Sequence, residues 1–185
     1  MSEVEPIRTQ RLELVSMSVP FMKALLVGDV DEASREMGAT TPAWMPDDMF
    51  HTVIYRLGQL TADPAVRQWL TRAMVLTDES GARRVIGAIG FHGPPDQDGR
   101  LEMGYRVDPE YRQQGYARES ATAMYDWAHR EHGVTTFVAA VAPDNVASLN
   151  LIKEFSYVQI GEQMDEIDGL EYVFETHWPL GATTD

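Results

Sequence analysis

The sequence contains no cysteine among its 185 residues, which excludes disulfides, thiolate metal ligands and a cysteine nucleophile. Basic residues are also few: 15 Lys and Arg stand against 29 Asp and Glu, giving a formal net charge of −14. Proteins that bind nucleic acids through their overall charge are basic, so this charge excludes that class. The sequence has no run of about 18 apolar residues, so we expect no membrane span.

The composition predicts one folded domain. Hydrophobic residues make up 44% of the chain, which is enough for a core of ordinary size. Neither an internal repeat nor a linker rich in Pro, Gly or Ser divides the sequence. We therefore expect a single domain over residues 1–185, with its core at about 7–179. The first residues lack the basic and then apolar pattern of a secretory signal, which predicts a cytoplasmic protein.

Charge is unevenly distributed along the chain. Six carboxylates and no basic residue lie between Ser156 and Glu175, whereas four arginines lie between Arg100 and Arg118. Such a group of arginines in an acidic chain either holds an anion or belongs to a solvated helix face with ordinary ion pairs. The charge count alone favours the second interpretation.

Hydrophobic periodicity predicts a mixed α/β sheet. One stripe of apolar residues, Phe50, Val53, Ile54, Leu57 and Leu60, predicts the buried face of a helix. Three strands from 72 to 107 form an antiparallel meander, and a strand–helix–strand unit follows it. The predicted strands are 11–16, 72–77, 84–91, 100–107, 134–141, 157–166 and 170–178, and the predicted helices run from about 18 to 28, 47 to 63, 115 to 132 and 145 to 155.

The segment from Val107 to Arg118 is the most informative part of the chain. It combines a strand end, a proline break and a glycine-containing turn that leads into a helix. Free N–H groups at such a helix start, together with the helix dipole, favour a phosphate. Gly115 allows the backbone to approach a ligand, and Ala117 keeps the first helical turn small. The segment lacks the Gly-Lys-Ser/Thr of a Walker loop and the further glycines of a dinucleotide fingerprint.

Four motifs in order resemble one family. Arg112–Ala117 resembles the R/Q-x-x-G-x-G/A signature of the GNAT superfamily of N-acetyltransferases, which holds acetyl-CoA. Glu102–Pro109 is similar to the E-I-G-Y-x-(L/V)-x-P strand of its ribosomal-protein N-acetyltransferase (Rim-type) subgroup. Asn145 with Ser148 resembles the D-N-x-x-S helix start, and 7–14 resembles the opening I-x-T-x-R-L-x-L. Together the motifs cover nearly the whole chain.

The resemblance implies the GNAT fold, a mostly antiparallel twisted sheet of about seven strands with helices on both sides. In that fold two strands splay apart and admit the pantetheine arm of the coenzyme. The backbone of the signature strand then faces the thioester, and the turn that follows wraps the pyrophosphate. Asn145 contacts the pantetheine arm, and it serves equally as a helix cap. The implied coenzyme-binding residues are Tyr105, Arg106, Val107, Arg112, Gln113, Gln114, Gly115, Tyr116, Ala117, Arg118 and Asn145.

Acetyl transfer to an amine needs a base, an oxyanion donor and an acid. Glu102 is the candidate base, acting through water; alternatively it forms an ordinary ion pair with Arg106 on the same strand face. By resemblance Ser148 is the acid, although a serine in a first helical turn is also commonplace. Other superfamily members place a tyrosine where this chain has Ile152. The backbone N–H of Tyr105 is the implied oxyanion donor.

The resemblance leaves the acceptor open. It places the acceptor against 29–60 and the loop 92–99, where Trp44 and Met45 either line a pocket or anchor the loop in the core. Nearby carboxylates suit a cationic amine and equally suit solubility. The five histidines lack metal-ligand spacing, so we expect no metal. Two departures from the family also stand out: Ser156 replaces a glycine, and Glu154 replaces a basic residue whose contact with the CoA 3′-phosphate is thereby left open.

The implied function is an acetyl-CoA-dependent N-acetyltransferase acting on a protein N-terminus or a small amine. Because the chain has no cysteine, the amine attacks the thioester directly in a ternary complex. The alternative is a regulatory module that binds acyl-CoA without catalysis, against which the presence of both Glu102 and Ser148 argues. The expected partner is a cationic amine rather than a nucleic acid or membrane, and the chain is a monomer or a homodimer.

Overall fold

The structure is a computed structural model that describes residues 4–165 and 169–180. Its strands form one sheet in the order β1-β2-β3-β4-β5-β6-β8-β7, and every neighbouring pair is antiparallel except β5 with β6. The strands are β1 (Ile7–Arg8), β2 (Leu12–Ser16), β3 (Arg72–Thr77), β4 (Arg83–Phe91), β5 (Arg100–Val107), β6 (Thr136–Val141), β7 (Val158–Asp165) and β8 (Gly169–His177).

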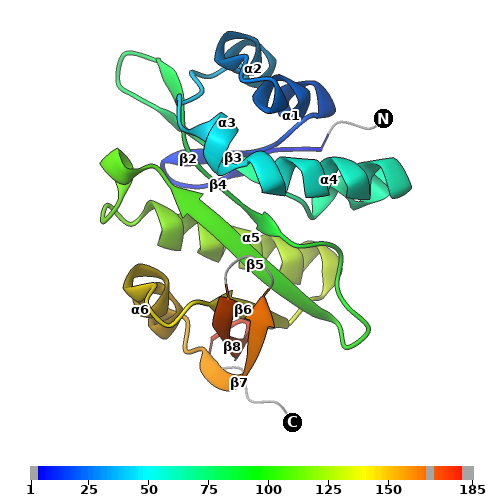
Figure 1. Ribbon diagram of the computed structural model, residues 1–185. Helices are drawn as coiled ribbons and strands as arrows, with labels where there is room; N and C mark the ends of the chain where they lie inside the picture. The colour runs from blue at the N-terminus through cyan, green and yellow to red at the C-terminus, as the bar shows by residue number, and fades with distance from the viewer. Residues whose placement is uncertain (1–3, 166–168, 181–185) are drawn as a thin grey trace.

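Helices cover both faces of this sheet (Figure 1). Helix α5 packs on one face through Ala121, Met124 and Ala128. Helices α1 to α4 pack on the other face of the N-terminal strands, around Phe21, Met45 and the small side chains of β3 and β4. The helices are α1 (Val19–Leu26), α2 (Val30–Met37), α3 (Met45–Asp48), α4 (Phe50–Ala62), α5 (Tyr116–His132) and α6 (Val146–Glu154), with short 3₁₀ turns η1 (Pro64–Gln68) and η2 (Pro109–Tyr111).

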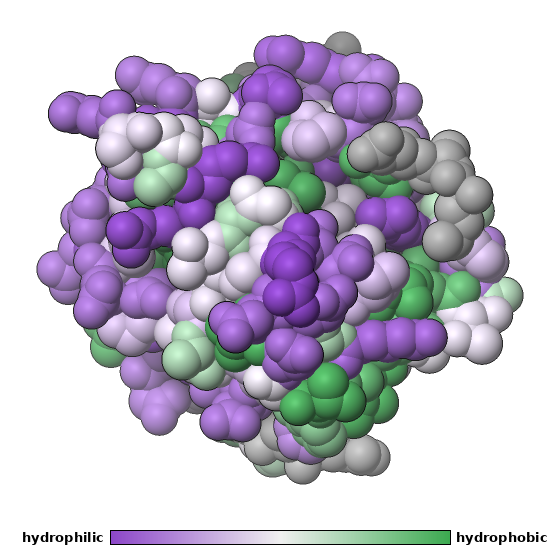
Figure 2. All heavy atoms as spheres, turned by 90° about the horizontal axis from the view of Figure 1, so that it is seen from above, coloured by the Kyte–Doolittle hydropathy of each residue, from purple (hydrophilic) through white to green (hydrophobic). Residues whose placement is uncertain are grey.

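The outer surface of the N-terminal helices is polar. Figure 2 shows the molecule from above α1 and α2, and most of this face is hydrophilic, with apolar residues gathered toward one edge. Asp31 and Glu36 of α2 are exposed there. In the described part of the chain, no helix is both long enough and apolar enough to span a membrane.

The predicted mixed sheet, with its meander and its strand–helix–strand unit β5-α5-β6, is confirmed. The sheet has eight strands rather than about seven, because the two residues of β1 pair with β2. Helix α2 was not predicted, although Asp29 caps its first turn and Gly38 ends it with a φ of 63°. The pair Asp168-Gly169, which in the sequence favours a tight hairpin turn between the last two strands, lies partly outside the described residues.

The buried face of α4 differs from the predicted stripe. Val53 and Leu60 are buried as expected, but Phe50 is 42% exposed and Ile54 is 48% exposed. Arg56 is buried instead, at 6% exposure, because its guanidinium donates to the carbonyl of His92, to Thr71 beneath the helix and to Gln59 on α4 itself. A charged residue with several acceptors is thus buried at a position outside the predicted apolar stripe.

Candidate active site

Strand β5 has different neighbours along its two halves. Within the described residues it pairs with β6 only from Arg100 to Glu102, and it pairs with β4 from Met103 to Val107. The second half of β5 therefore borders a wedge where β6 has separated from it. This wedge lies in the middle of the sheet, between its two parts.

Backbone directions show which residues face the wedge. The carbonyl of Glu102 accepts from the N–H of His92 at 2.9 Å, and the N–H of Asp108 donates to Ile86 at 2.9 Å, so even-numbered residues of β5 point to the β4 side. Successive residues of a strand point their backbone groups to opposite sides. The backbone groups of Tyr105 and Val107 consequently point toward the wedge.

Arg106 does not lie with the other residues that the resemblance implies for coenzyme binding. Its backbone is directed at β4, where it is paired with Ala88. Its guanidinium forms an ion pair with Asp48 at 2.5 Å and lies 5.7 Å from the ring centre of Trp44. The side chain therefore belongs to the face covered by α3 and α4, and is not part of the turn that leads into α5.

The turn between η2 and α5 forms an anion-binding geometry. Arg112 Nε donates to the carbonyl of Val107 at 3.0 Å, which ties the turn to the end of β5. Gln113 and Gly115 have φ angles of 60° and 82°, so the chain turns sharply before α5 begins. Among the described residues no side chain caps this helix start. Its first N–H groups, which include those of Tyr116 and Ala117, are thus available to a phosphate.

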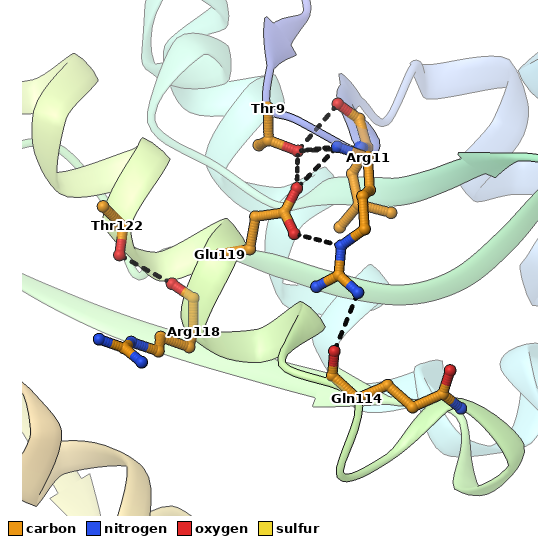
Figure 3. Close-up of polar contacts among 7 residues, drawn as sticks. Thr9, Arg11, Gln114, Arg118, Glu119 and Thr122 are labelled. Atoms are coloured by element: carbon orange, nitrogen blue, oxygen red, sulfur yellow. Dashed lines mark hydrogen bonds and ion pairs between the residues drawn. The ribbon is translucent and has the colours of Figure 1, made fainter.

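Arg11 holds this turn from the N-terminal segment (Figure 3). Its Nε donates to Glu119 Oε2 at 2.7 Å, its Nη1 donates to the Gln114 carbonyl at 3.0 Å, and its guanidinium lies 4.2 Å from the ring centre of Tyr116. Thr9 Oγ1 donates to the same Glu119 carboxylate. We call Thr9, Arg11, Gln114 and Glu119 the N-terminal clasp. The opening motif that contains Arg11 was noticed in the sequence, but no role was predicted for this residue.

The charge of Glu119 is preserved by these contacts. Burial alone would raise the pKa of its carboxyl group, but hydrogen bonds from Thr9 and Arg11 outweigh burial and lower the pKa. The carboxylate therefore remains ionised at neutral pH and keeps its pairing with Arg11.

The four arginines near each other in the sequence are dispersed in the structure. Arg100 pairs with Asp96 and Asp98 at 3.0 Å each, at the far end of β5. Arg118 points away from the N-terminal clasp (Figure 3) and pairs with Glu154 at 3.1 Å. Only Arg112 and Arg118 lie on the segment that forms the turn and the start of α5.

Three residues on the α5 side of the sheet approach one another. Asn145 Oδ1 accepts the N–H of Ser148 at 3.1 Å, so the helix cap predicted as one of its roles is present. Ser148 Oγ lies 3.0 Å from Tyr105 Oη, and either hydroxyl can donate. Burial raises the pKa of Tyr105, and the bond to Ser148 opposes this only in part. Ile152, by contrast, is buried in the core.

A charged group lies on the opposite face of β5. Glu102 Oε1 is 3.4 Å from His92 Nδ1. The contact with His92 lowers the pKa of Glu102; burial opposes this, and the charge of Arg56 adds to it. The ion pair between Glu102 and Arg106 that was one alternative is not formed in the described structure, because Arg106 is held by Asp48. Neither His92 nor Arg56 was selected from the sequence.

The loop between α2 and α3 is anchored in the structure, which is one of the two alternatives raised for it. Met45 is fully buried and anchors the loop in the core. Trp44 is half-buried, and its indole N–H donates to Asp108 at the end of β5. Within residues 4–165 and 169–180, no cluster of side chains could hold a metal ion.

A cavity of about 800 Å³ lies at the opposite end of α5 from the turn. Arg72 lines it and is fully buried, and its guanidinium donates to the carbonyls of Glu5, Leu14 and Gln68. Burial, together with the charge of Arg67, lowers the pKa of Arg72 to about 10. This arginine holds the N-terminal segment against the sheet, and none of the candidate catalytic or coenzyme-binding residues lines the cavity.

The comparisons with known proteins all find acetyltransferases. The family model described as "Acetyltransferase (GNAT) domain" matches residues 26–156. The chain is 26% identical over 153 residues to a protein of Bacillus subtilis (strain 168) named "Uncharacterized N-acetyltransferase YjdG", covering 82% of this chain and 89% of that protein. It is also 26% identical over 144 residues to the FsC-acetyl coenzyme A-N(2)-transacetylase of Aspergillus fumigatus, covering 77% of this chain and 60% of that one.

Solved structures share the fold. The ribosomal-protein-S5-alanine acetyltransferase of Vibrio fischeri superposes with a TM-score of 0.60 at 15% identity, covering 96% of this chain and 99% of that one. An acetyltransferase of Agrobacterium tumefaciens superposes with a TM-score of 0.61 at 20% identity, covering 96% of each chain. At these identities the likeness concerns the fold.

Proposed function

Because this chain belongs to the acetyltransferase (GNAT) domain family and is thus an N-acetyltransferase, we propose that it acetylates a primary amine by direct attack in a ternary complex. Acetyl-CoA is the co-substrate that the family uses in general. We assign the chain to the Rim-type subgroup on its motifs, and the acceptor to a protein N-terminus or a small-molecule amine.

The observation that carries the proposal is the wedge beside β5. Pairing with β6 ends at Glu102, and the backbone groups of Tyr105 and Val107 point into the gap that follows. An extended arm with amide groups, such as pantetheine, fits there as an added strand. The uncapped start of α5 follows directly along the chain and suits the pyrophosphate. The wedge would take the thioester end of acetyl-CoA, and the start of α5 would take its phosphates, which is the order of these groups along the coenzyme.

The reacting groups follow from this placement. Glu102 drives the removal of a proton from the ammonium through an intermediary, since only a neutral amine has a lone pair for attack. The resemblance implies water as that intermediary. The N–H of Tyr105 donates to the oxygen that becomes negative when the amine adds to the thioester. Ser148 gives its hydroxyl proton to the departing thiolate, and the Tyr105 hydroxyl at 3.0 Å holds Ser148 in place.

The acceptor site lies on the charged face of β5. Glu102 and the overall charge of −14 favour a cationic amine over an anionic one. Phe50 and Ile54 expose apolar surface on the neighbouring helix α4. An amine with an apolar portion suits this combination better than a small hydrophilic one.

Binding of acetyl-CoA and free thiol release test the proposal. The wild-type protein is mixed with acetyl-CoA and a panel comprising n-butylamine, spermidine and short peptides with free N-termini. Glu102→Gln keeps the size of the side chain and removes the base, so we expect unchanged acetyl-CoA affinity and a turnover at least about 100-fold lower. Glu175→Gln, on β8, is the matched control and should retain turnover.

The possible results separate the alternatives. Failure of acetyl-CoA to bind contradicts the proposed site as a whole. Binding without turnover of any acceptor, with Glu102→Gln indistinguishable from the wild type, supports the regulatory module instead. Turnover of peptides but not of free amines, or the reverse, selects between the two acceptor classes.

A further inference from the structure

His92 has an unusually well-fixed backbone for an exposed residue after a strand end. Its N–H donates to the carbonyl of Glu102 at 2.9 Å. Its own carbonyl accepts from Arg56 Nη1 at 2.9 Å and from Gln59 Nε2 at 2.8 Å. The buried arginine of α4 therefore holds His92 in place. A reacting side chain must be held in one position by its neighbours, and these contacts hold His92 in that way.

The imidazole ring lies on the charged face of β5, over Glu102 and Gly104. Its Nδ1 is 3.4 Å from Glu102 Oε1. Its Nε2 lies over Gly104, where a Cβ atom would come within 2.9 Å of it. Gly104 precedes Tyr105, whose N–H faces the wedge. The absence of a side chain at Gly104 thus leaves room for the ring beside the position proposed for the thioester.

This arrangement fixes the roles of the two ring nitrogens. A carboxylate beside Nδ1 favours the neutral tautomer with its proton on Nδ1, which leaves a lone pair on Nε2. The contact with His92 lowers the pKa of Glu102, so that the carboxylate itself is a weak proton acceptor at neutral pH. An ionised carboxylate does, however, stabilise an imidazolium beside it.

We propose that His92 Nε2 accepts the proton of the attacking amine, and that Glu102 acts through the imidazole rather than through water. The inference rests on the proposed acetyl transfer and names the atom that carries the proton in it. His92 is then a catalytic residue, and Glu102 and Arg56 are positioning residues for it. The histidine was passed over in the sequence because its neighbours are distant along the chain.

Protons and bonds balance in this scheme. The ammonium gives one proton to Nε2, which passes it to solvent, and the neutral amine then forms the C–N bond with the acetyl carbon. A second proton leaves the nitrogen for Nε2 as the C–S bond breaks, and Nε2 passes this proton to solvent as well. The thiolate takes a proton from Ser148, which regains one from solvent. The products are the acetamide, free CoA and one released proton.

The groups that face His92 come from three elements. Glu102 on β5 carries the negative charge, Arg56 on α4 carries a positive charge, and Gln59 on α4 is neutral. Asp165 at the end of β7 is close enough to raise the pKa of Glu102 slightly. The experiment therefore compares variants of the same protein, in which the other charged groups of this cluster are unchanged.

The first test is the pH dependence of kcat/KM with acetyl-CoA and an acceptor from the panel above. A proton acceptor must be unprotonated, so the wild-type kcat/KM should show an acid limb, over which it falls as the pH is lowered. His92→Gln should lose this acid limb and about 100-fold or more in kcat/KM. His177→Gln, at the far end of β8, should keep both the limb and the rate.

Two further variants separate chemistry from structure. Gly104→Ala forces the imidazole away from the wedge and should reproduce His92→Gln with unchanged acetyl-CoA affinity. The double variant His92→Gln/Glu102→Gln should be no slower than the slower single variant, because the two residues act as one unit. Additive losses in the double variant contradict the proposal.

The second test needs no acceptor. In a long-range proton–nitrogen NMR spectrum of the labelled protein, the five histidines give separate patterns, and His92 is identified by its loss in His92→Gln. We expect a neutral ring protonated on Nδ1, and a shift of this pattern in Glu102→Gln. An Nε2-protonated ring, or a retained acid limb in His92→Gln, overturns the inference. If acetyl transfer itself is absent while the tautomer is as expected, it is the proposed function that fails.

Discussion

The two faces of strand β5 are built differently. On the α5 face, Tyr105 meets Ser148 through neutral hydroxyls, and the remaining contacts are apolar or involve the backbone. On the opposite face, Glu102 and Arg106 each meet a charged or ionisable partner, His92 and Asp48. The comparison suggests that one face holds the coenzyme through shape and backbone, and that the other handles the amine through charge.

The difference also separates local from distant contributions. The residues of the proposed coenzyme face lie mostly in one segment, from β5 through the turn to the start of α5. The charged face takes Asp48 from α3, Arg56 from α4 and His92 from the loop after β4. Variants of the turn and of the start of α5 should alter coenzyme binding, whereas variants of the charged face should alter acceptor use.

The largest expected effect is on the turn before α5. Gly115→Glu places a carboxylate at the proposed pyrophosphate site, and like charges in contact cost several kcal/mol, so acetyl-CoA affinity should fall more than about 100-fold. Gly133→Glu is the matched control, because Gly133 has a similar positive φ at the other end of α5. Calorimetric titration with CoA measures both; equal affinities in the two variants contradict the site.

Removal of the proposed acid should have a smaller effect, and it should leave acetyl-CoA binding intact. We expect Ser148→Ala to lower kcat about 100-fold, the low end for an acid–base group, and Tyr105→Phe to lower it about tenfold because it acts through Ser148. Affinity for acetyl-CoA should stay within about twofold in both. Acetyl thioesters of more acidic thiols, whose thiolates leave without help from an acid, should restore the rate of Ser148→Ala. A lack of rescue would falsify the assignment of this serine.

The N-terminal clasp should affect the coenzyme face modestly. Arg11→Ala frees the Gln114 carbonyl and the Tyr116 ring, and we expect about a tenfold rise in the Kd for CoA, equal to about 1.4 kcal/mol. Arg11→Lys keeps the charge without the planar fork and should behave like Arg11→Ala. Arg8→Ala on β1 is the control. If Arg11→Lys binds CoA with wild-type affinity, the affinity depends on the positive charge at position 11 and not on the hydrogen-bond geometry of the guanidinium.

The smallest effect lies on neither face. Ser156 has a φ of 56°, in the region that favours glycine, at the position where the family has glycine. Ser156→Gly relieves this strain and should raise the free energy of unfolding by about 0.5–1 kcal/mol, without changing turnover. Ser156→Ala retains a Cβ atom and should bring no such gain. Denaturant titration of the three proteins distinguishes these outcomes.

Much of this arrangement could be predicted from the sequence because it depends on neighbours along the chain. The strands of the meander, the glycine turn at Gly115 and the cap at Asn145 each follow from local backbone chemistry. Ser148 and Glu102 were selected by their place in motifs, and their catalytic roles stay predictions. The absence of cysteine had already excluded a thioester on the enzyme.

Tertiary structure alone decided the partners of the charged residues. Strand alternation and the pairing of β5 with β4 turned Arg106 away from the turn, and the burial of Arg56 followed from the carbonyl of His92, which is 36 residues away. Periodicity ranks positions by apolarity and carries no information on which distant acceptor a buried charge will meet. The sequence by itself determined the sheet and the turn, while long-range packing determined which histidine stands beside Glu102.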